Sequence, residues 1–360
     1  MRAFLRQILD LPRRARHRRT IASIERSDNP QPVLSFGGVL DHGGLIHGGA
    51  VKLLHLREAF AGSEERFNLL YLVSSSQPDF ANDLVRLCRT RGIRFVWNQN
   101  GVGYPAWAGR EAERHNAPMR KLRAQADYII YQSEFCRTSA EKFLGPEAGA
   151  GEVLFNPVDL QKFHPPAQPP PLPLRLLALG TQNYAGRVLS PIDCVKTLRA
   201  GGIECTLTIA GRLLWNNAEA GILRYIESLG LSDQVRLRPA FTQDEAAELY
   251  RTHHILLHPK YLDPCPTVVI EALASGLPVV GSGSGGLPEM VPADCGELIP
   301  APVSWTNLIT PRPDELASAV TKILPHLSDY SRAARRHAEK SFDGAQWVAR
   351  HREIFHKLLS

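Results

Sequence analysis

Residues 263–289 read DPCPTVVIEALASGLPVVGSGSGGLPE, a stretch that places a helix, a strand and a glycine-rich turn in immediate succession. Thr267–Ala274 has helix-forming residues, begins with a hydroxyl that can cap free amides, and follows two prolines that stiffen the approach. Gly276 then ends the predicted helix. The apolar run Leu277–Gly281 predicts a buried parallel strand, and SGSGG follows as a loop.

The two carboxylates of this stretch, Asp263 and Glu271, suit a nucleoside diphosphate ligand. The N–H groups and the positive dipole end of the helix favour a diphosphate. Glu271, inside the helix, can accept two hydrogen bonds from a ribose diol, while Asp263 in the preceding loop can reach a second polyol. An ordinary strand–loop–helix–strand unit with a solvated Glu271 has the same spacing, so the pattern alone leaves both interpretations open.

Apolar strand-like runs alternate with helical patterns along the chain, which predicts an α/β fold with two doubly wound parallel sheets. The strand-like runs are 32–36, 68–73, 94–97, 127–132, 174–180, 205–211, 235–239, 254–259 and 278–281, with helices near 50–60 and 80–90 and a helical end over 330–360. Residues 165–173 (PPAQPPPLP) contain six prolines and favour an extended connector. We therefore expect Rossmann-like domains over 21–165 and 174–335, with a linker over 166–173 and a final helix over 336–360.

The excess of positive charge lies at the start of the chain. Seven arginines and one aspartate in residues 1–20 sum to +6, which equals the net charge of the whole protein. The remaining residues are neutral overall, which disfavours nucleic-acid binding. The segment either docks on an anionic membrane surface or is a solvated basic tail; its apolar residues at helical spacing are Phe4, Leu5, Ile8 and Leu9.

The six cysteines are scattered, with no C-x-x-C pair, so the sequence indicates neither a zinc site nor a disulfide framework. No stretch approaches about 18 consecutive apolar residues, and the N-terminal segment lacks the apolar core of a secretory signal. We expect a cytoplasmic protein, with a peripheral contact to the inner face of the membrane if the basic segment docks there.

Residues 258–291, HPKYLDPCPTVVIEALASGLPVVGSGSGGLPEMV, resemble the donor-site signature of the retaining GT-B glycosyltransferases of family 4, in which two acidic residues separated by seven others bracket a Gly/Pro loop. Three further segments resemble this family in order and spacing: HGGAVKLL (47–54), NQNGVGYPAW (98–107), and DYIIYQSEFC running on to FNPVDLQKF (127–163). The resemblance covers roughly residues 30–360.

The resemblance implies two Rossmann-like domains facing a cleft and a terminal helix that crosses back to the first domain. The implied activity is hexosyl transfer, with retention, from a nucleoside diphosphate sugar to an acceptor hydroxyl. It implies no metal and no other cofactor. The expected acceptor is a glycan or a lipid-linked molecule, in the synthesis of surface polysaccharide or lipid-linked glycan.

The resemblance also assigns roles to single residues. Glu271 would hold the donor ribose, Asp263 the sugar hydroxyls, and Arg187 the diphosphate. Arg212 would lie near the nucleobase, and the other implied donor contacts are Gly180, Cys265, Pro266, Thr267 and Val268. On the acceptor side, the implied residues are Gly48, Gly49, Asn98, Gln99, Asn100 and Tyr104, with Trp107 as a second aromatic ring and the glycine pairs 37–38 and 43–44 as alternatives to 48–49.

Three positions depart from the family pattern. Asp263 stands where glutamate is usual, and no histidine occurs near Asn98, where many relatives have one. Ile192 stands where a second basic residue of the phosphate clamp is usual, which leaves Lys260, or less well Lys196, to replace it. These departures keep open a non-catalytic nucleotide-sugar-binding or scaffold protein, and a GT-B epimerase or hydrolase. Three histidines cluster beside the donor motif, His253, His254 and His258, and the two that bracket the apolar strand are interpreted as core residues rather than ligands.

Overall fold

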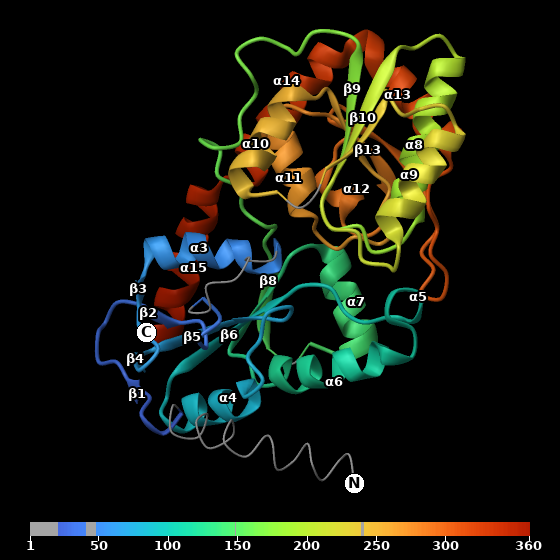
Figure 1. Cartoon of the computed structure of the whole chain (residues 1–360). Coiled ribbons are helices and arrows are strands. Elements are labelled where there is room, and N and C mark those ends of the chain that lie inside the picture. Colours follow the sequence, from blue (N-terminus) through green and yellow to red (C-terminus); the bar gives the residue numbers. More distant parts are fainter. Residues whose placement is uncertain (1–20, 41–47, 148, 239–240) are drawn as a thin grey trace. The chain divides into compact units, whose positions relative to one another are not determined.

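The computed structural model describes residues 21–40, 48–147, 149–238 and 241–360 (Figure 1). The arginine-rich segment 1–20, His47 and the glycine pair 43–44 lie outside the described residues. The chain divides into two compact units. The first contains the described residues up to Tyr104, residues 108–154 and residues 345–360, and the second contains residues 105–107 and 155–344.

The first unit is built on a six-stranded, all-parallel sheet in the order β3-β2-β5-β6-β7-β8 (Figure 1). Its strands are β2 (Val33–Ser35), β3 (Ala61–Gly62), β5 (Leu69–Val73), β6 (Arg94–Gln99), β7 (Tyr128–Tyr131) and β8 (Ala150–Val153), and β1 (Glu25–Arg26) pairs separately with β4 (Arg66–Phe67). Its helices are α3 (Gly48–Ala59), α4 (Ala81–Thr90), α6 (Ala112–Arg123), α7 (Glu134–Leu144) and α15 (Gly344–Leu359), with a short α5 (Pro105–Ala108) and a 3-10 turn at Gly109–Glu111 near the change of unit.

Both faces of this sheet are covered, which explains why its central strands read as continuous apolar runs. All five residues of β5 are buried. On one face, Leu70 and Leu72 of β5 pack with α4, α6 and α7. On the other face, Leu69, Tyr71 and Val73 pack with α3 and α15. The predicted doubly wound arrangement is confirmed in this unit.

The second unit repeats the plan with a parallel sheet in the order β11-β10-β9-β12-β13-β14. Its strands are β9 (Leu174–Leu179), β10 (Cys205–Ala210), β11 (Val235–Arg238), β12 (Ile255–His258), β13 (Val279–Gly283) and β14 (Gly296–Pro300). Its helices are α8 (Gly186–Ala200), α9 (Ala218–Ser228), α10 (Gln243–Thr252), α11 (Thr267–Ala274), α12 (Leu287–Met290), α13 (Pro313–Ile323) and α14 (Leu327–Ser341), with a 3-10 turn at Leu324–His326. Helices α8, α9 and α13 cover one face, and α10, α11 and α14 cover the other.

The change of unit falls between Leu154 and Phe155, before the proline-rich stretch that the sequence analysis took as the boundary. Phe163 is buried in the core of the second unit, with Phe155 packed against it, and Asn156 Nδ2 donates to Cys265 O at 3.0 Å. Burial of these aromatic side chains ties the segment to the second sheet. The proline-rich stretch therefore lies inside the second unit, just before β9.

The helical end of the chain is two helices rather than the single stretch that the sequence predicted. Helix α14 ends at Ser341 and packs in the core of the second unit. The chain is extended at Asp343, which pairs with Val158, and α15 then belongs to the first unit from Ala345 onward. Its apolar residues Trp347, Ile354 and Phe355 are buried against the first sheet.

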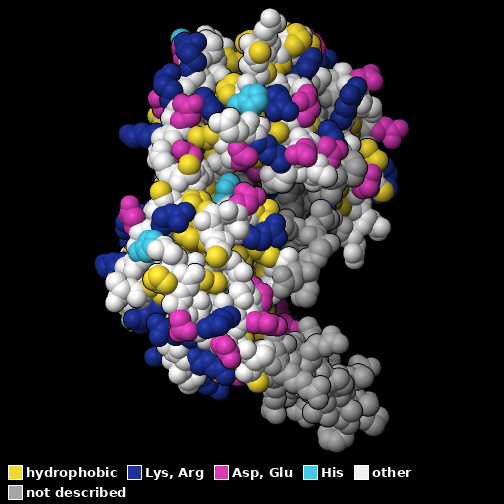
Figure 2. Space-filling view, turned by 90° about the vertical axis from the view of Figure 1, so that its left-hand side faces the viewer, with side chains coloured by type: hydrophobic (Ala, Val, Ile, Leu, Met, Phe, Trp, Pro, Cys, Tyr) yellow, Lys and Arg dark blue, Asp and Glu magenta, His cyan; other side chains and the backbone are white. Residues whose placement is uncertain are grey.

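On the face shown in Figure 2, Lys and Arg side chains are interspersed with Asp and Glu side chains. All six cysteines are free and buried. Among the described residues, no helix combines the length and the apolar character that crossing a bilayer requires.

Candidate functional site

The helix, strand and glycine turn predicted over residues 263–289 are present in the second unit as α11, β13 and the residues that follow. Pro266, rather than Thr267, occupies the N-cap position of α11, and no side chain caps this end of the helix. Thr267 and Val268 therefore have backbone N–H groups that donate to no described residue. Two aligned amides at a helix start suit an anion. Gly276, with a φ of +75°, ends the helix as predicted.

Glycines let the backbone approach the start of α11 at the carboxyl edge of the sheet. Gly180, after β9, has a φ of +103°, and a Cβ there would lie 3.4 Å from Val268 Cγ1. Gly211, after β10, has a φ of +124°, and a Cβ there would lie only 2.2 Å from Gly180 O. Ligands of doubly wound sheets bind at this carboxyl edge. Gly180 and Val268, both predicted to line the donor site, are therefore in contact range at that edge.

Glu271 is a buried carboxylate, with 4% of its surface exposed. Tyr250 Oη donates to Glu271 Oε2 at 2.9 Å, and Gln243 Nε2 lies 3.4 Å from Oε1. Burial raises the pKa of Glu271 to about 7, although these hydrogen bonds and the charge of Lys162 act in the opposite direction. The carboxyl group is therefore not the solvated surface residue of the alternative interpretation.

Asp263 is buried to a similar degree, but it is hydrogen-bonded to a histidine and paired with a lysine. His258 Nε2 lies 2.9 Å and Lys260 Nζ 3.1 Å from the same oxygen, Asp263 Oδ2. Burial opposes ionisation, but the ammonium of Lys260 and the hydrogen bond from His258, with the charge of Arg187, hold the pKa of Asp263 well below its ordinary value. The two acidic residues of the motif thus differ: Asp263 is firmly ionised, whereas Glu271 titrates near neutrality.

The glycine-rich turn supports the backbone of the Asp263 loop. Gly286 N donates to Asp263 O at 2.8 Å, and Leu262 N donates to Ser284 Oγ at 2.9 Å. A Cβ on Gly285, which has a φ of +68°, would lie 2.5 Å from Asp263 O. The turn was predicted only as a loop; its glycines are required here because two segments of backbone touch. Its first two residues, Ser282 and Gly283, belong to β13.

Arg187, in the first turn of α8, is a buried cation with 4% of its surface exposed. Its Nη1 donates to Thr181 O and to Asn183 Oδ1. Its Nε and Nη2 have no hydrogen-bond acceptor among the described residues, and Nε is fully buried. Burial lowers the pKa of Arg187, against the charge of Asp263. Nη1 of the guanidinium is thus committed to the loop after β9, and Nη2 is the nitrogen that remains for a ligand.

The two substitutes considered for the missing clamp lysine lie in different settings. Ile192 is fully buried in the core between α8 and the sheet, so this position cannot present a cation here. Lys196 is exposed on α8. Lys260, a quarter exposed, pairs with Asp263.

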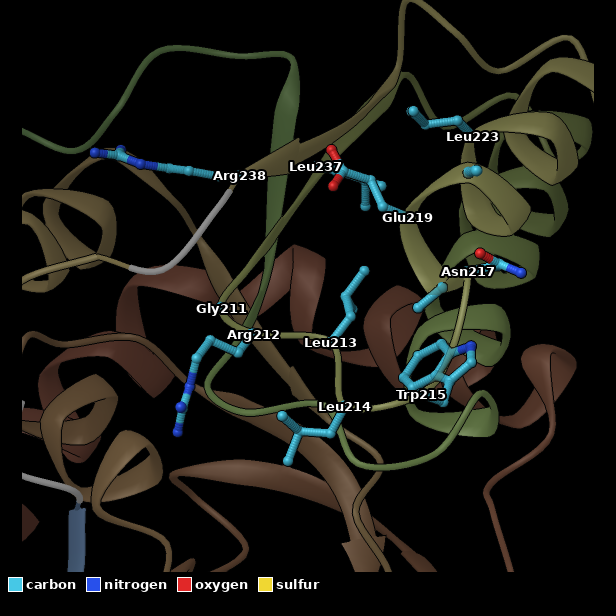
Figure 3. Close-up of a pocket in the computed structure, with 12 residues that line it drawn as sticks. Gly211, Arg212, Leu213, Leu214, Trp215, Asn217, Glu219, Leu223, Leu237 and Arg238 are labelled. Atoms are coloured by element: carbon cyan, nitrogen blue, oxygen red, sulfur yellow. The ribbon is translucent and has the colours of Figure 1, made fainter.

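Arg212 lines a pocket of about 740 Å³ formed by the loop after β10, helix α9 and the end of β11. Figure 3 shows Trp215 on the α9 side of this pocket, and the Arg212 side chain extends in the direction away from Trp215. The nucleobase contact predicted for Arg212 stays a prediction.

In the first unit, the amide residues at the end of β6 and just after it form a buried network around an unpredicted cation. Lys52 Nζ, from α3, donates to Asn98 Oδ1 at 2.6 Å and to Asn100 Oδ1 at 2.9 Å. Asn98 Nδ2 donates to Tyr71 Oη at 2.8 Å, which lies 3.0 Å from His351 Nε2 of α15. His351 Nδ1 faces Trp347 O, so Nδ1 is the protonated nitrogen and Tyr71 donates to Nε2. This places Asn98 and Asn100 together, bonded to one ammonium.

The other residues predicted for the acceptor differ in exposure. Gln99 is fully buried; its Oε1 accepts from Trp97 Nε1 at 2.8 Å and its Nε2 donates to Asn100 O at 3.1 Å, so its amide is used inside the unit. Tyr104 is buried against Phe143, whereas Trp107 is 47% exposed. Gly48 and Gly49 form the start of α3.

Sequence reasoning missed Tyr250, Gln243 and Lys52, and placed His258 in the core. His253 and His254 are buried, and burial lowers the pKa of both, as expected for core histidines. His258 is buried too, but it contacts Asp263. Within the described ranges, no group of three or more His, Cys, Asp or Glu side chains is arranged to hold a metal ion.

Comparison with known proteins gives consistent results. Residues 178–333 match the model of the family described as Glycosyl transferases group 1. The D-inositol 3-phosphate glycosyltransferase of Nocardiopsis dassonvillei is 28% identical over 181 residues, 46% of this chain and 42% of that protein. The phosphatidylinositol N-acetylglucosaminyltransferase gpi3 subunit of Schizosaccharomyces pombe is 21% identical over 270 residues, 74% of this chain and 56% of that protein. The matched regions thus span about half the length of these relatives.

Solved structures agree on the architecture. Anabaena HepE in complex with UDP-glucose superposes with a TM-score of 0.69 and 14% identity, covering 90% of this chain and 98% of that one. Sucrose-phosphate synthase from Thermosynechococcus elongatus superposes with a TM-score of 0.64 and 18% identity, covering 86% and 76%. The chain therefore has the fold of the GT-B glycosyltransferases, and its second unit matches the group 1 glycosyl transferase family.

Proposed function

We propose that this protein transfers a sugar from a nucleoside diphosphate donor to an acceptor hydroxyl, with retention of the anomeric configuration. The observation that carries the proposal is the pairing of two buried carboxylates, Asp263 and Glu271, on either side of an uncapped helix start. Burying a carboxylate costs free energy unless the carboxylate is paired or hydrogen-bonded. Buried carboxylates with shifted pKa values therefore cluster at functional sites. The group 1 family match over 178–333 and the named glycosyltransferase relatives support the same activity.

The donor would lie along the carboxyl edge of the second sheet. Glu271 in its ionised form accepts two hydrogen bonds from the ribose diol. The N–H groups of Thr267 and Val268 and Nη2 of Arg187 bind the diphosphate and stabilise the charge that develops on it as the glycosidic bond breaks. Lys260 adds a second cation, in place of the clamp lysine that Ile192 replaces. Pro266 and Cys265 shape the approach to the helix.

The chemical step follows from the residues available. Asp263 holds the sugar, and no role for a metal is needed because cations and amides meet the charge on the leaving group. In the retaining mechanism that the signature implies, the acceptor hydroxyl attacks the face from which the diphosphate leaves. The departing phosphate oxygen then takes the acceptor proton. Asn98, Asn100 and the start of α3 at Gly48–Gly49 would face the acceptor.

The arginine-rich segment 1–20 bears on the acceptor class and on the location of the protein. A glycan or lipid-linked acceptor, used by a cytoplasmic enzyme at the inner face of the membrane, fits the arginine-rich segment 1–20. Binding of the full chain and of a chain lacking residues 1–20 to anionic vesicles separates membrane docking from a solvated tail: docking predicts that only the full chain sediments with the vesicles.

Release of nucleoside diphosphate from a panel of sugar conjugates tests the activity. The wild-type protein is expected to release diphosphate, and Asp263→Asn to lose turnover by at least about tenfold while still binding the nucleotide, because the sugar contact loses its charge. Thr267→Ser is the matched control at the helix start, since it keeps the backbone amide. Nucleotide binding without turnover in the wild type would favour the scaffold alternative, and release of free sugar without transfer would favour the hydrolase.

A further inference from the structure

We propose that His258 is a positioning residue for Asp263: its Nε2–H, together with Lys260 Nζ, fixes Oδ2, so that Asp263 offers only Oδ1 to the sugar of the donor. This inference rests on the proposed function, because it states how Asp263 binds the sugar of the donor in that site. From the sequence alone, His258 is predicted to be a core residue.

The backbone of His258 has little freedom to move. It is the last residue of β12 and pairs in register with Gly281 of β13. A Cβ on Gly281 would lie 2.4 Å from His258 O, so the two strands approach each other more closely here than a side chain would allow. The His258 side chain is 2% exposed. The imidazole is therefore held on a rigid element, as a group that positions another must be.

The hydrogen bond has a fixed direction. A carboxylate only accepts, so the proton lies on His258 Nε2, 2.9 Å from Asp263 Oδ2. Burial lowers the pKa of His258, against the hydrogen bond and charge of Asp263, and this favours a neutral ring. A neutral donor orients the carboxylate without adding a second full positive charge beside Lys260.

The two oxygens of Asp263 consequently differ. Oδ2 receives both His258 and Lys260, whereas no described residue donates to Oδ1. The Asp263 side chain keeps 8% of its surface exposed, and Oδ1 is its oxygen without a described donor. Two donors on one oxygen stop the carboxylate from rotating to present both oxygens to a vicinal diol. One sugar hydroxyl therefore donates to Oδ1, while Lys260 stays bonded to Oδ2.

Removing the imidazole therefore affects the sugar contact and leaves the nucleotide contacts intact. His258→Leu deletes the donor at similar volume, and His258→Gln restores an N–H at a reach close to that of Nε2. His253→Leu is the matched control: it also removes a buried histidine of the second unit, but one whose ring contacts Leu249 O and Thr208 Oγ1.

The measurement is the dissociation constant, by calorimetry, for four ligand pairs: UDP with UDP-glucose, GDP with GDP-mannose, ADP with ADP-glucose, and TDP with TDP-glucose. For the pair that the wild type binds, His258→Leu is expected to weaken binding of the sugar conjugate about tenfold more than binding of the diphosphate. A tenfold change is about the value of one hydrogen bond. His258→Gln should recover most of this ratio, and His253→Leu should leave it unchanged.

An equal loss for both members of the pair, or no loss for either, would overturn the inference. If His258→Leu does not fold, His258→Asn replaces it, because its shorter amide cannot reach Asp263 Oδ2 and must show the same selective loss. Failure of the proposed function looks different: the wild-type protein then binds none of the four diphosphates and none of their sugar conjugates.

Discussion

Replacing Glu271 by glutamine is expected to stabilise the folded protein above pH 7 and to weaken its binding of nucleoside diphosphates. Burial raises the pKa of Glu271 from 4.5 to about 7. The folded state therefore holds this proton more tightly than the unfolded chain does. Stability falls as the pH rises from about 4.5 to about 7, and the loss is complete above that range. At about 1.4 kcal/mol per pH unit, the ionised carboxylate costs about 3 kcal/mol.

The hydrogen bonds around Glu271 can accommodate the amide of Glu271→Gln. Tyr250 Oη has one proton but two acceptors, Val268 O at 3.0 Å and Glu271 Oε2 at 2.9 Å. With an amide at position 271, Tyr250 donates to Val268 O and accepts from the new N–H, while Gln243 still faces an oxygen. No buried polar group is left without a partner, so we expect a net gain of about 1 to 3 kcal/mol at pH 8 and little gain at pH 4.5.

Urea unfolding of wild type and Glu271→Gln between pH 4.5 and 8.5 measures this difference. The difference in unfolding free energy should grow with pH and level off above about pH 7. A variant that is no more stable than wild type at pH 8 would refute the reasoning from burial. In a separate binding measurement, Glu271→Gln should bind nucleoside diphosphate at least about tenfold more weakly than wild type. The reason is that an amide accepts fewer hydrogen bonds from the ribose diol than a carboxylate does. Glu297→Gln, which also loses a carboxylate bonded to a tyrosine, is expected to leave nucleotide binding unchanged.

Two further substitutions test the packing behind the site. Gly285→Ala should lower the free energy of unfolding by urea by about 2 to 4 kcal/mol, because its Cβ would meet Asp263 O at 2.5 Å. The control is Gly202→Ala, where φ is also positive but the space is open, and it should cost only about 1 to 2 kcal/mol. Equal costs would argue against the contact. Tyr71→Phe should cost about 2 to 4 kcal/mol, since it leaves Asn98 Nδ2 and His351 Nε2 without their shared partner, and a cost below about 0.5 kcal/mol would mean that the network contributes little.

Much of the fold could be predicted because local patterns and packing agree. The run LLYLV of β5 is apolar on both faces because helices cover both sides, and TVVIEALA with Gly276 gave the bounds of α11. Short or half-buried strands were missed, such as β3 (Ala61–Gly62) and β14 (Gly296–Pro300), because pairing with a neighbour rather than composition defines them. The boundary between units was misplaced because Phe155 and Phe163 bury their rings against residues far along the chain.

The candidate site shows the same limit. The spacing of Asp263 and Glu271 on either side of a helix start is a local pattern, so it could be read from the sequence. Tyr250, which bonds Glu271, is 21 residues away, and Lys52, which bonds Asn98, is 46 residues away. Packing of helices α10 and α11 brings the first pair together, and packing of α3 near β6 brings the second pair together. His258 was close enough to Asp263 to be considered, but an apolar strand of buried residues hides the difference between a core histidine and one that faces a carboxylate.

Thermal unfolding of the purified protein with UDP, GDP, ADP, TDP and their common sugar conjugates tests the central claim most directly. A ligand that binds only the folded state raises the free energy of unfolding by about 2.7 kcal/mol when its concentration is 100 times its dissociation constant. The account predicts a raised midpoint with one of these nucleoside diphosphates, and a smaller rise for Glu271→Gln. An unchanged midpoint with every one of them, at millimolar concentration, would contradict the donor site at Asp263 and Glu271.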